Sequence, residues 1–322
     1  MDLLSFIHVN LLNPAIMCFI LGIIATIFKS NLSLPDVVYD AIAIYLLLAI
    51  GIKGGIKIAS SDLSNFTLPV FATIAIALLT TFIAFFLLKL VGKLDFINSA
   101  AIAAHYGSVS VVTFMAAISF LQIMQIEYEP FMTALVAILE VPSIIIALCM
   151  VYIKRSGKIS HIFKALRKAL STKSLILLIG GITIGMTMDK NHTQDIKYFF
   201  ETPFKGVLCL FLLQKGIVAA TKFHEIRKIG SFLIIFNLAV PIPFALIGIY
   251  LGKLCGLSLG GGTLLGVMAA SSSYIAVPAA MKASLPEASP TLSLVSTLGI
   301  NVPFNIIFGI GIYFTLAQII YS

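Results

Sequence analysis

Two hydroxyl-rich stretches interrupt otherwise apolar sequence. AHYGSVSVVTFMAA occupies 104–117 and MAASSSYIAVPAA occupies 268–280. Aligned on their Ala-Ala ends, they pair Gly107 with Ala270, Ser108 with Ser271, and Ser110 with Ser273. Secondary transporters build solute sites from two interrupted helices whose ends meet near the membrane midplane. The spacing therefore predicts two broken helices that share one solute site.

The residues predicted to bind the solute are small or carry a hydroxyl group: Gly107, Ser108, Ser110, Ser271, Ser272 and Ser273. The partial positive charge at a half-helix N-terminus suits an anion, and the hydroxyl groups would complete its coordination. A sodium ion could instead lie near Ser110, Thr113 and Ser273, with freed carbonyl groups as further ligands. The structural alternative is that small residues only allow close helix packing in lipid, which is the favoured reading for Gly107 taken alone.

Ionisable residues inside apolar segments are the next candidates, because a charge in a membrane is unfavourable and therefore often functional. Glu140 stands two residues before Pro142. It could carry a proton, bind a cation or pair with a lysine, and a purely structural ion pair is the alternative. Lys215, in FLLQKGIV, could attract an anion or occupy the place of sodium. His105 could gate the site or relay protons, although a histidine beside a helix break can equally be structural.

The composition places these residues in a membrane. Hydrophobic residues make up 60% of the 322 residues, charged residues 11%, and the mean hydropathy is +1.09. The apolar runs are continuous rather than alternating, which excludes a transmembrane β-barrel pattern. The start lacks the basic region of a cleaved signal, so the first helix is expected to be retained. Four cysteines without metal or redox spacing are expected to be buried small hydrophobes: Cys18, Cys149, Cys209 and Cys255.

Breaks at proline, glycine and charge clusters predict an all-α polytopic protein of about ten spans. The predicted spans are 9–28, 35–58, 67–91, 98–124, 130–153, 174–188, 203–222, 230–252, 261–284 and 290–320. Five spans in 1–153 and five in 174–322 flank a connection at 154–173. Lys53-Gly54 and Lys215-Gly216 recur 162 residues apart, so we predict a repeat. A repeat of five helices must be inverted, with broken fourth and ninth helices.

The connection at 154–173 carries seven basic residues and no acidic residue. Short basic loops stay in the cytoplasm, and counting spans from there places both termini outside the cytoplasm. The net charge of +8 thus reflects membrane topology, and no nucleic-acid partner is expected.

The missing motifs narrow the function. The chain has no Walker loop, no HExxH motif and no histidine-rich metal box, so neither ATP hydrolysis nor metal catalysis is expected. We therefore predict a secondary transporter of a small anion and not an enzyme, moved by alternating access. The alternative from another class is a membrane-embedded sensor or enzyme that binds a solute without moving it.

The segments at 34–55, 107–117, 131–147 and especially GVMAASSSYIAVPAAMKASLP at 266–286, followed by STLGINVP, resemble the sodium-dependent bicarbonate transporter family known from cyanobacteria and other bacteria. The resemblance covers nearly the whole chain. It implies core and gate domains that move as an elevator, bicarbonate and sodium sites at the broken helices, a homotrimer in the bacterial inner membrane, and regulation by a PII-like protein on the cytoplasmic side.

By this resemblance, Gly107, Ser108, Ser110 and Thr113 match the first family motif and Ser271 to Ser273 match the second. The chain also departs from the family pattern. Tyr274 replaces an Asp, Val111-Val112-Thr113 replaces Gly-Ser-Thr, and Lys215 stands at a usually apolar position. Losing a carboxylate and gaining an ammonium weakens a cation site. Proton coupling through Glu140 or His105, or no coupling at all, therefore stays open beside sodium coupling.

Overall fold

The computed structural model describes residues 10–59, 66–154, 167, 170–188 and 193–322. Every regular element in these ranges is a helix. The first half contains α2 (Pro14–Ile27), α3 (Asp36–Ala59), α4 (Thr67–Phe86), η1 (Leu87–Val91), α5 (Phe96–Tyr106), α6 (Val111–Ile123), α7 (Met132–Leu139) and α8 (Pro142–Lys154). The second half contains α10 (Lys173–Thr187), α11 (Thr193–Phe200), α12 (Phe204–Thr221), η2 (Phe223–Lys228), α13 (Gly230–Ala239), α14 (Pro241–Leu254), α15 (Leu259–Ala270), α16 (Ala276–Ser284), α17 (Pro290–Leu294), η3 (Val295–Asn301), α18 (Val302–Phe304), η4 (Asn305–Gly309) and α19 (Ile310–Tyr321).

Seven helical stretches in the described residues are long and apolar enough to cross a membrane. Shorter apolar helices cover Pro14–Ile27, Lys173–Thr187 and Leu259–Ala270. Each predicted span overlaps one of these ten stretches. The protein is therefore a multi-pass membrane protein, while ten crossings and an inverted repeat stay predictions.

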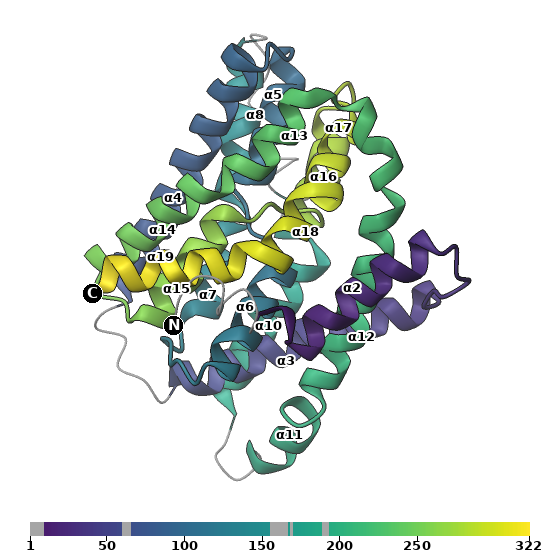
Figure 1. Ribbon diagram of the computed structural model, residues 1–322. Coiled ribbons are helices and arrows are strands. Elements are labelled where there is room, and N and C mark those ends of the chain that lie inside the picture. The colour runs from purple at the N-terminus through teal and green to yellow at the C-terminus, as the bar shows by residue number, and fades with distance from the viewer. Residues whose placement is uncertain (1–9, 60–65, 155–166, 168–169, 189–192) are drawn as a thin grey trace.

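Four helices form a small bundle, namely α2, α3, α10 and α12, which lies low and to the right in Figure 1. Glycines bring its helices into close contact. A Cβ on Gly55 would lie 2.1 Å from the carbonyl oxygen of Ile182 in α10, and a Cβ on Gly216 would lie 2.0 Å from that of Phe19 in α2. In the pairs α2–α12 and α3–α10, a helix from the first half of the chain packs against a helix from the second half.

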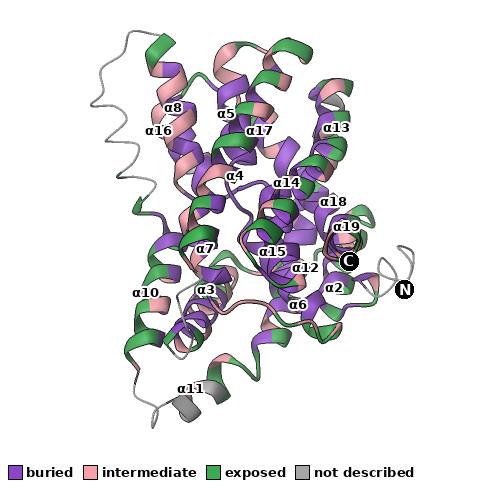
Figure 2. Ribbon diagram, turned by 90° about the vertical axis from the view of Figure 1, so that its left-hand side faces the viewer, coloured by how far each residue is buried: buried purple, intermediate pink, exposed green. Residues whose placement is uncertain are grey.

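The remaining long helices form a large bundle around α6 and α15. Residues 111–121 of α6 and 260–270 of α15 are all buried, and Figure 2 shows both helices inside the molecule. Because these residues are buried on every side of each helix, other parts of the protein surround both helices. The interrupted segments are therefore positioned by packing on every face. The predicted gate and core would correspond to the small and large bundles.

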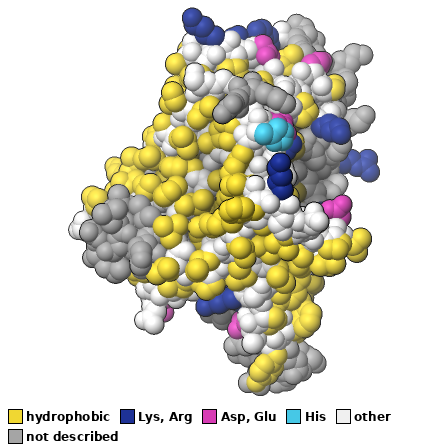
Figure 3. All heavy atoms as spheres, turned by 45° about the vertical axis from the view of Figure 1, so that its right-hand side comes forward, with side chains coloured by type: hydrophobic (Ala, Val, Ile, Leu, Met, Phe, Trp, Pro, Cys, Tyr) yellow, Lys and Arg dark blue, Asp and Glu magenta, His cyan; other side chains and the backbone are white. Residues whose placement is uncertain are grey.

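Apolar side chains cover much of the outer surface. Figure 3 shows hydrophobic groups across much of the visible face, with most Lys and Arg side chains along its top and right side. Val37, Phe28 and Ile153 are 82%, 80% and 79% exposed, as lipid-facing side chains would be.

Some expectations need correction. All four cysteines are half-buried rather than buried. The fifth predicted span, 130–153, overlaps the apolar stretch Met132–Lys154, and within it a turn at Glu140 and Val141 separates α7 from α8. The helix α11 was not predicted. Most of the 154–173 connection and the loop containing Asp62 lie outside the described residues.

Candidate functional site: the crossing of two interrupted helices

The first interruption separates α5 from α6. Gly107 follows the last turn of α5, and Ser110 caps α6 by accepting a hydrogen bond from the backbone N–H of Thr113 at 3.2 Å. A serine before a helix satisfies one of the N–H groups that the first turn leaves unpaired. The sequence thus ends one helix and starts another within four residues.

Gly107 has a packing role. A Cβ at this position would lie 1.8 Å from Thr81 Oγ1 and 2.8 Å from the Cβ of Ser143. Its φ of −87° is ordinary for any residue, so the glycine is required by close contact with α4 and α8 rather than by backbone conformation. It offers no side-chain ligand.

The second interruption separates α15 from α16. Ser271 follows α15 in an extended conformation, with φ −82° and ψ 164°, and its hydroxyl donates to the carbonyl oxygen of Met268 at 3.0 Å. Pro278 lies in the first turn of α16, where a missing N–H group removes no helical hydrogen bond. The stretch from Ser271 to Ile275 is therefore non-helical inside the large bundle.

The two interruptions bind each other directly. The Ser271 hydroxyl accepts from the backbone N–H of Ser110 at 3.0 Å. The backbone N–H of Ser273 donates to the carbonyl oxygen of His105 at 2.9 Å. His105 Nδ1 donates in return to the carbonyl oxygen of Ser273 at 2.5 Å. The structure thus brings together two predicted segments that lie more than 160 positions apart, and their breaks satisfy one another's backbone groups.

Beside the crossing lies a buried amide network that the sequence analysis did not identify. Ser272 Oγ donates to Asn301 Oδ1 at 2.8 Å. Asn305 Nδ2 donates to the same oxygen at 2.9 Å, and Tyr313 donates to Asn305 Oδ1 at 2.6 Å. Asn301 and Asn305 are fully buried in the π-helical turns η3 and η4. Two asparagines four apart in an apolar span were the available signal, since buried amides need partners.

Glu140 occupies the third interruption, between α7 and α8, and is only 3% exposed. Its Oε2 accepts from the Ser174 hydroxyl at 3.4 Å, and its backbone carbonyl accepts from Ser108 Oγ at 3.5 Å. Among the described residues it forms no ion pair. The alternative of a Glu–Lys pair therefore has no support here, and Glu140 is a buried carboxyl group one contact from the first break.

Lys215 lies against aromatic rings. Its Nζ is 4.5 Å from the ring centroid of Tyr274, 4.9 Å from Tyr39 and 5.4 Å from Phe211. The Tyr274 hydroxyl is buried and lies near Ser110, but its geometry falls short of a hydrogen bond. The structure thus places Lys215 and Tyr274 in direct contact beside the crossing.

The predicted sodium ligands are already engaged. Ser110 Oγ accepts from the backbone N–H of Thr113 and from Thr113 Oγ1 at 2.9 Å, so both of its lone pairs are used. No group of three His, Cys, Asp or Glu residues that could hold a metal occurs in the described ranges. Sodium at Ser110, Thr113 and Ser273 stays a prediction that this arrangement does not favour.

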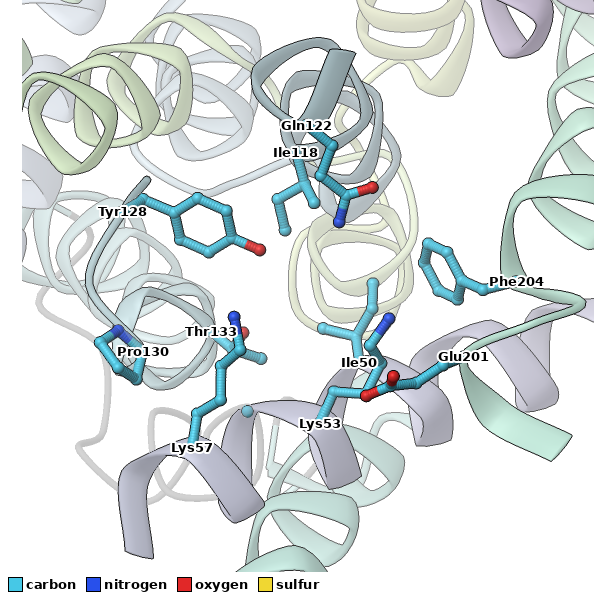
Figure 4. Close-up of a pocket in the computed structure, with 11 residues that line it drawn as sticks. Ile50, Lys53, Lys57, Ile118, Gln122, Tyr128, Pro130, Thr133, Glu201 and Phe204 are labelled. Carbon is cyan, nitrogen blue, oxygen red and sulfur yellow. The ribbon is translucent and has the colours of Figure 1, made fainter. Parts of the chain in front are cut away.

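A polar cavity of about 260 Å³ lies between the two bundles. Figure 4 shows Lys53 and Lys57 of α3 entering it, with the Gln122 amide and the Tyr128 hydroxyl opposite and Glu201 beside Lys53. A second cavity of about 200 Å³ is lined by His105, Pro278, Lys282 and Ser289, among others. His105 Nε2 is buried, and no described residue forms a hydrogen bond with it. Both cavities carry basic side chains, which favours an anionic solute.

Comparison with known families identifies the family of this chain. The family model of the Na+-dependent bicarbonate transporter superfamily matches residues 14–318. The chain belongs to this family. A search of curated proteins finds no match to the transporter. The matched residues include both interrupted segments and the helices of both bundles.

Proposed function

We propose that this protein is a secondary transporter of a small anion, with bicarbonate as the first candidate. The observation that carries the proposal is the crossing, where the interruptions at 107–110 and 271–275 hydrogen-bond to each other. Interrupted membrane helices that face one another are how transporters expose backbone N–H groups and hydroxyl groups to a solute. Membership in a bicarbonate transporter family supports the choice of solute.

The electrostatics support an anion. The first turn of α6 directs its partial positive charge toward the crossing, and so does the first turn of α16. Lys53 and Lys57 line the cavity between the bundles, and Lys282 lines the second cavity. A solute entering by either cavity thus passes basic side chains.

Movement of the large bundle against the small one would give alternating access. The cavity of Figure 4 lies at their boundary, with α3 on one side and α6 and α7 on the other. The elevator cycle, the homotrimer, the inner-membrane location and the PII-like regulator belong to this proposal through the family resemblance.

Proton coupling is the second candidate for the energy source. The supporting observation is Glu140, whose buried carboxyl group forms no ion pair among the described residues and whose backbone carbonyl accepts a hydrogen bond from Ser108. A buried carboxyl group that can be neutral or charged is suited to carry a proton.

Uptake of labelled bicarbonate into proteoliposomes tests the proposal. We expect Ser272→Ala to lower uptake about tenfold, which corresponds to about 1.4 kcal/mol. Ser296→Ala is the matched control, because Ser296 is also buried but its hydroxyl has no hydrogen-bond partner. Wild-type protein that binds bicarbonate without taking it up would favour the sensor reading. Wild-type protein that neither binds nor transports any small anion would refute the proposal.

A further inference from the structure

The ammonium group of Lys215 is enclosed by aromatic rings. The residue lies within α12 and is 7% exposed. Three ring centroids lie 4.5 to 5.4 Å from Nζ, well inside the range of a cation–π contact. Tyr39 and Phe211 stack on each other with centroids 5.3 Å apart, so two walls of this cage are rigid. The cage of Tyr39, Phe211 and Tyr274 therefore holds a fixed positive charge.

Among the described residues, no carboxylate forms an ion pair with this charge. The ion pairs among the described residues join Lys173 to Asp40, Lys222 to Glu225 and His224 to Glu225, and none involves Lys215. A buried ammonium group without an anionic partner is unfavourable, and ring contacts offset only part of that. An anion bound nearby would provide the missing partner.

The cage connects the small bundle to the crossing. Tyr39 lies on α3 and Phe211 on α12, while Tyr274 belongs to the interruption between α15 and α16. The Tyr274 hydroxyl lies near Ser110, the capping residue of α6. The fixed charge is thus one side chain away from the proposed solute site.

The crossing offers a coupling cation no site comparable to the cage that holds the Lys215 ammonium group. Ser110 Oγ accepts two hydrogen bonds from Thr113, and the carbonyl oxygen of Ser273 accepts one from His105 Nδ1. None of these groups carries negative charge, and sodium would have to displace existing hydrogen bonds next to an ammonium group.

We propose that Lys215 is a built-in cation that supplies the positive charge a sodium ion would bring to the anion site, so that this family member binds and moves its anion without sodium. The inference rests on the proposed function and defines its ion dependence.

Uptake of labelled bicarbonate in sodium or choline medium at fixed pH tests this inference. We expect wild-type uptake to change less than twofold when choline replaces sodium. Lys215→Met should lower uptake at least tenfold, and Lys215→Arg, which keeps a charge over the rings, should stay within about threefold of wild type. Lys205→Met, the same change at an exposed position of α12, is the matched control. A tenfold loss of wild-type uptake in choline, or full uptake by Lys215→Met, would overturn the inference.

A binding measurement separates this inference from the proposed function. A resident sodium ion would raise the thermal unfolding midpoint with concentration. We expect sodium chloride and choline chloride to give the same midpoint for wild-type protein, as followed by circular dichroism. A rise specific to sodium would overturn the inference even if no anion is transported. If neither medium supports uptake, the proposed function fails while the midpoint still decides the sodium question. The same melts show whether Lys215→Met is folded.

Discussion

Serine hydroxyls at the crossing act mainly on backbone groups. Ser110 satisfies an N–H group of α6, and Ser271 satisfies the N–H group of Ser110. Each break would otherwise leave peptide groups unpaired away from water, at a cost of about 1–3 kcal/mol per group. At the residue scale, therefore, the same side chains that shape the site also make the interruptions stable.

Glu140 gives a prediction about coupling. Glu140→Gln should keep the contact with Ser174 and therefore fold like wild type. It should lose any increase in uptake that an inward proton gradient produces, since an amide cannot take up the proton. Uptake with and without the gradient measures this, with Glu127→Gln in an exposed loop as control. An unchanged response in Glu140→Gln would exclude Glu140 as the proton carrier.

Lys53 gives a prediction about solute approach. It lines the cavity between the bundles, and its Nζ lies 4.9 Å from the Phe204 ring centroid. Lys53→Met should raise the KM for bicarbonate several-fold with little change in kcat, because basic side chains raise the local anion concentration. The effect should shrink as ionic strength rises. Lys89→Met, outside this cavity, should leave KM unchanged, and an equal effect in both variants would contradict the assignment.

At the scale of the elements, close glycine contacts fix the helix pairs of the small bundle. A Cβ on Gly185 would lie 2.2 Å from the carbonyl oxygen of Ile52, whereas a Cβ on Gly180 meets nothing within 4 Å. The two glycines lie on the same helix, α10. At Gly185, α10 therefore packs directly against the backbone of α3, whereas at Gly180 it has free space around it.

The two glycines should therefore differ in how much an alanine substitution changes the stability of the protein. Gly185→Ala should destabilise the protein by about 1–3 kcal/mol, as overpacking in a close interface does. Gly180→Ala should be neutral or slightly stabilising, because alanine is the better helix former. Thermal unfolding of both variants measures the difference. Equal midpoints would show that α3 and α10 do not pack as closely as described.

The start of α5 gives a pH-dependent prediction. Asp95 caps this helix. Partial burial raises the pKa of its carboxyl group, but hydrogen bonds from Asn98 and Ile97 lower it by more. The net effect holds the pKa below its ordinary value of 3.8. A carboxyl group with a lowered pKa stabilises the folded protein at pH values above its pKa in the unfolded chain. This contribution is lost as the pH falls through the pKa of the group in the folded protein. Asp95→Ala should therefore lower the unfolding midpoint at neutral pH, by about 1 kcal/mol in stability, and less in acid. Asp95→Asn should keep most of the capping hydrogen bonds. A stability difference between wild type and Asp95→Ala that does not change with pH would argue against a lowered pKa at Asp95.

At the scale of the whole molecule, the distribution of charge predicts orientation. The connection at 154–173 is basic and should face the cytoplasm, whereas the loop with Glu127 and Glu129 should face outward. In a cysteine-free background, Glu127→Cys should react with a membrane-impermeant maleimide applied outside intact cells. Ser171→Cys should react only after the cells are opened. The reverse pattern would invert the topology and exchange the sides on which the two cavities open.

The sequence predicted the elements well where the signal is local. Apolar length predicted the helical stretches, and serine, glycine and proline predicted the interruptions at 107–110 and 271–275. The interruption at Glu140 was missed even though Pro142 follows it, because a proline can kink a helix without ending it. The role of Asn301 was missed because its partner Ser272 lies 29 positions away.

The sequence by itself determined membrane class, approximate helix positions, the two broken segments and the family, because apolar length, helix breakers and motifs are properties of adjacent residues. Only the tertiary structure decided that the breaks bind each other, that Gly107 is there for packing, and that Lys215 lies against Tyr274. These contacts join residues tens to more than 160 positions apart. Such pairings depend on how all helices pack at once, and no local pattern encodes them.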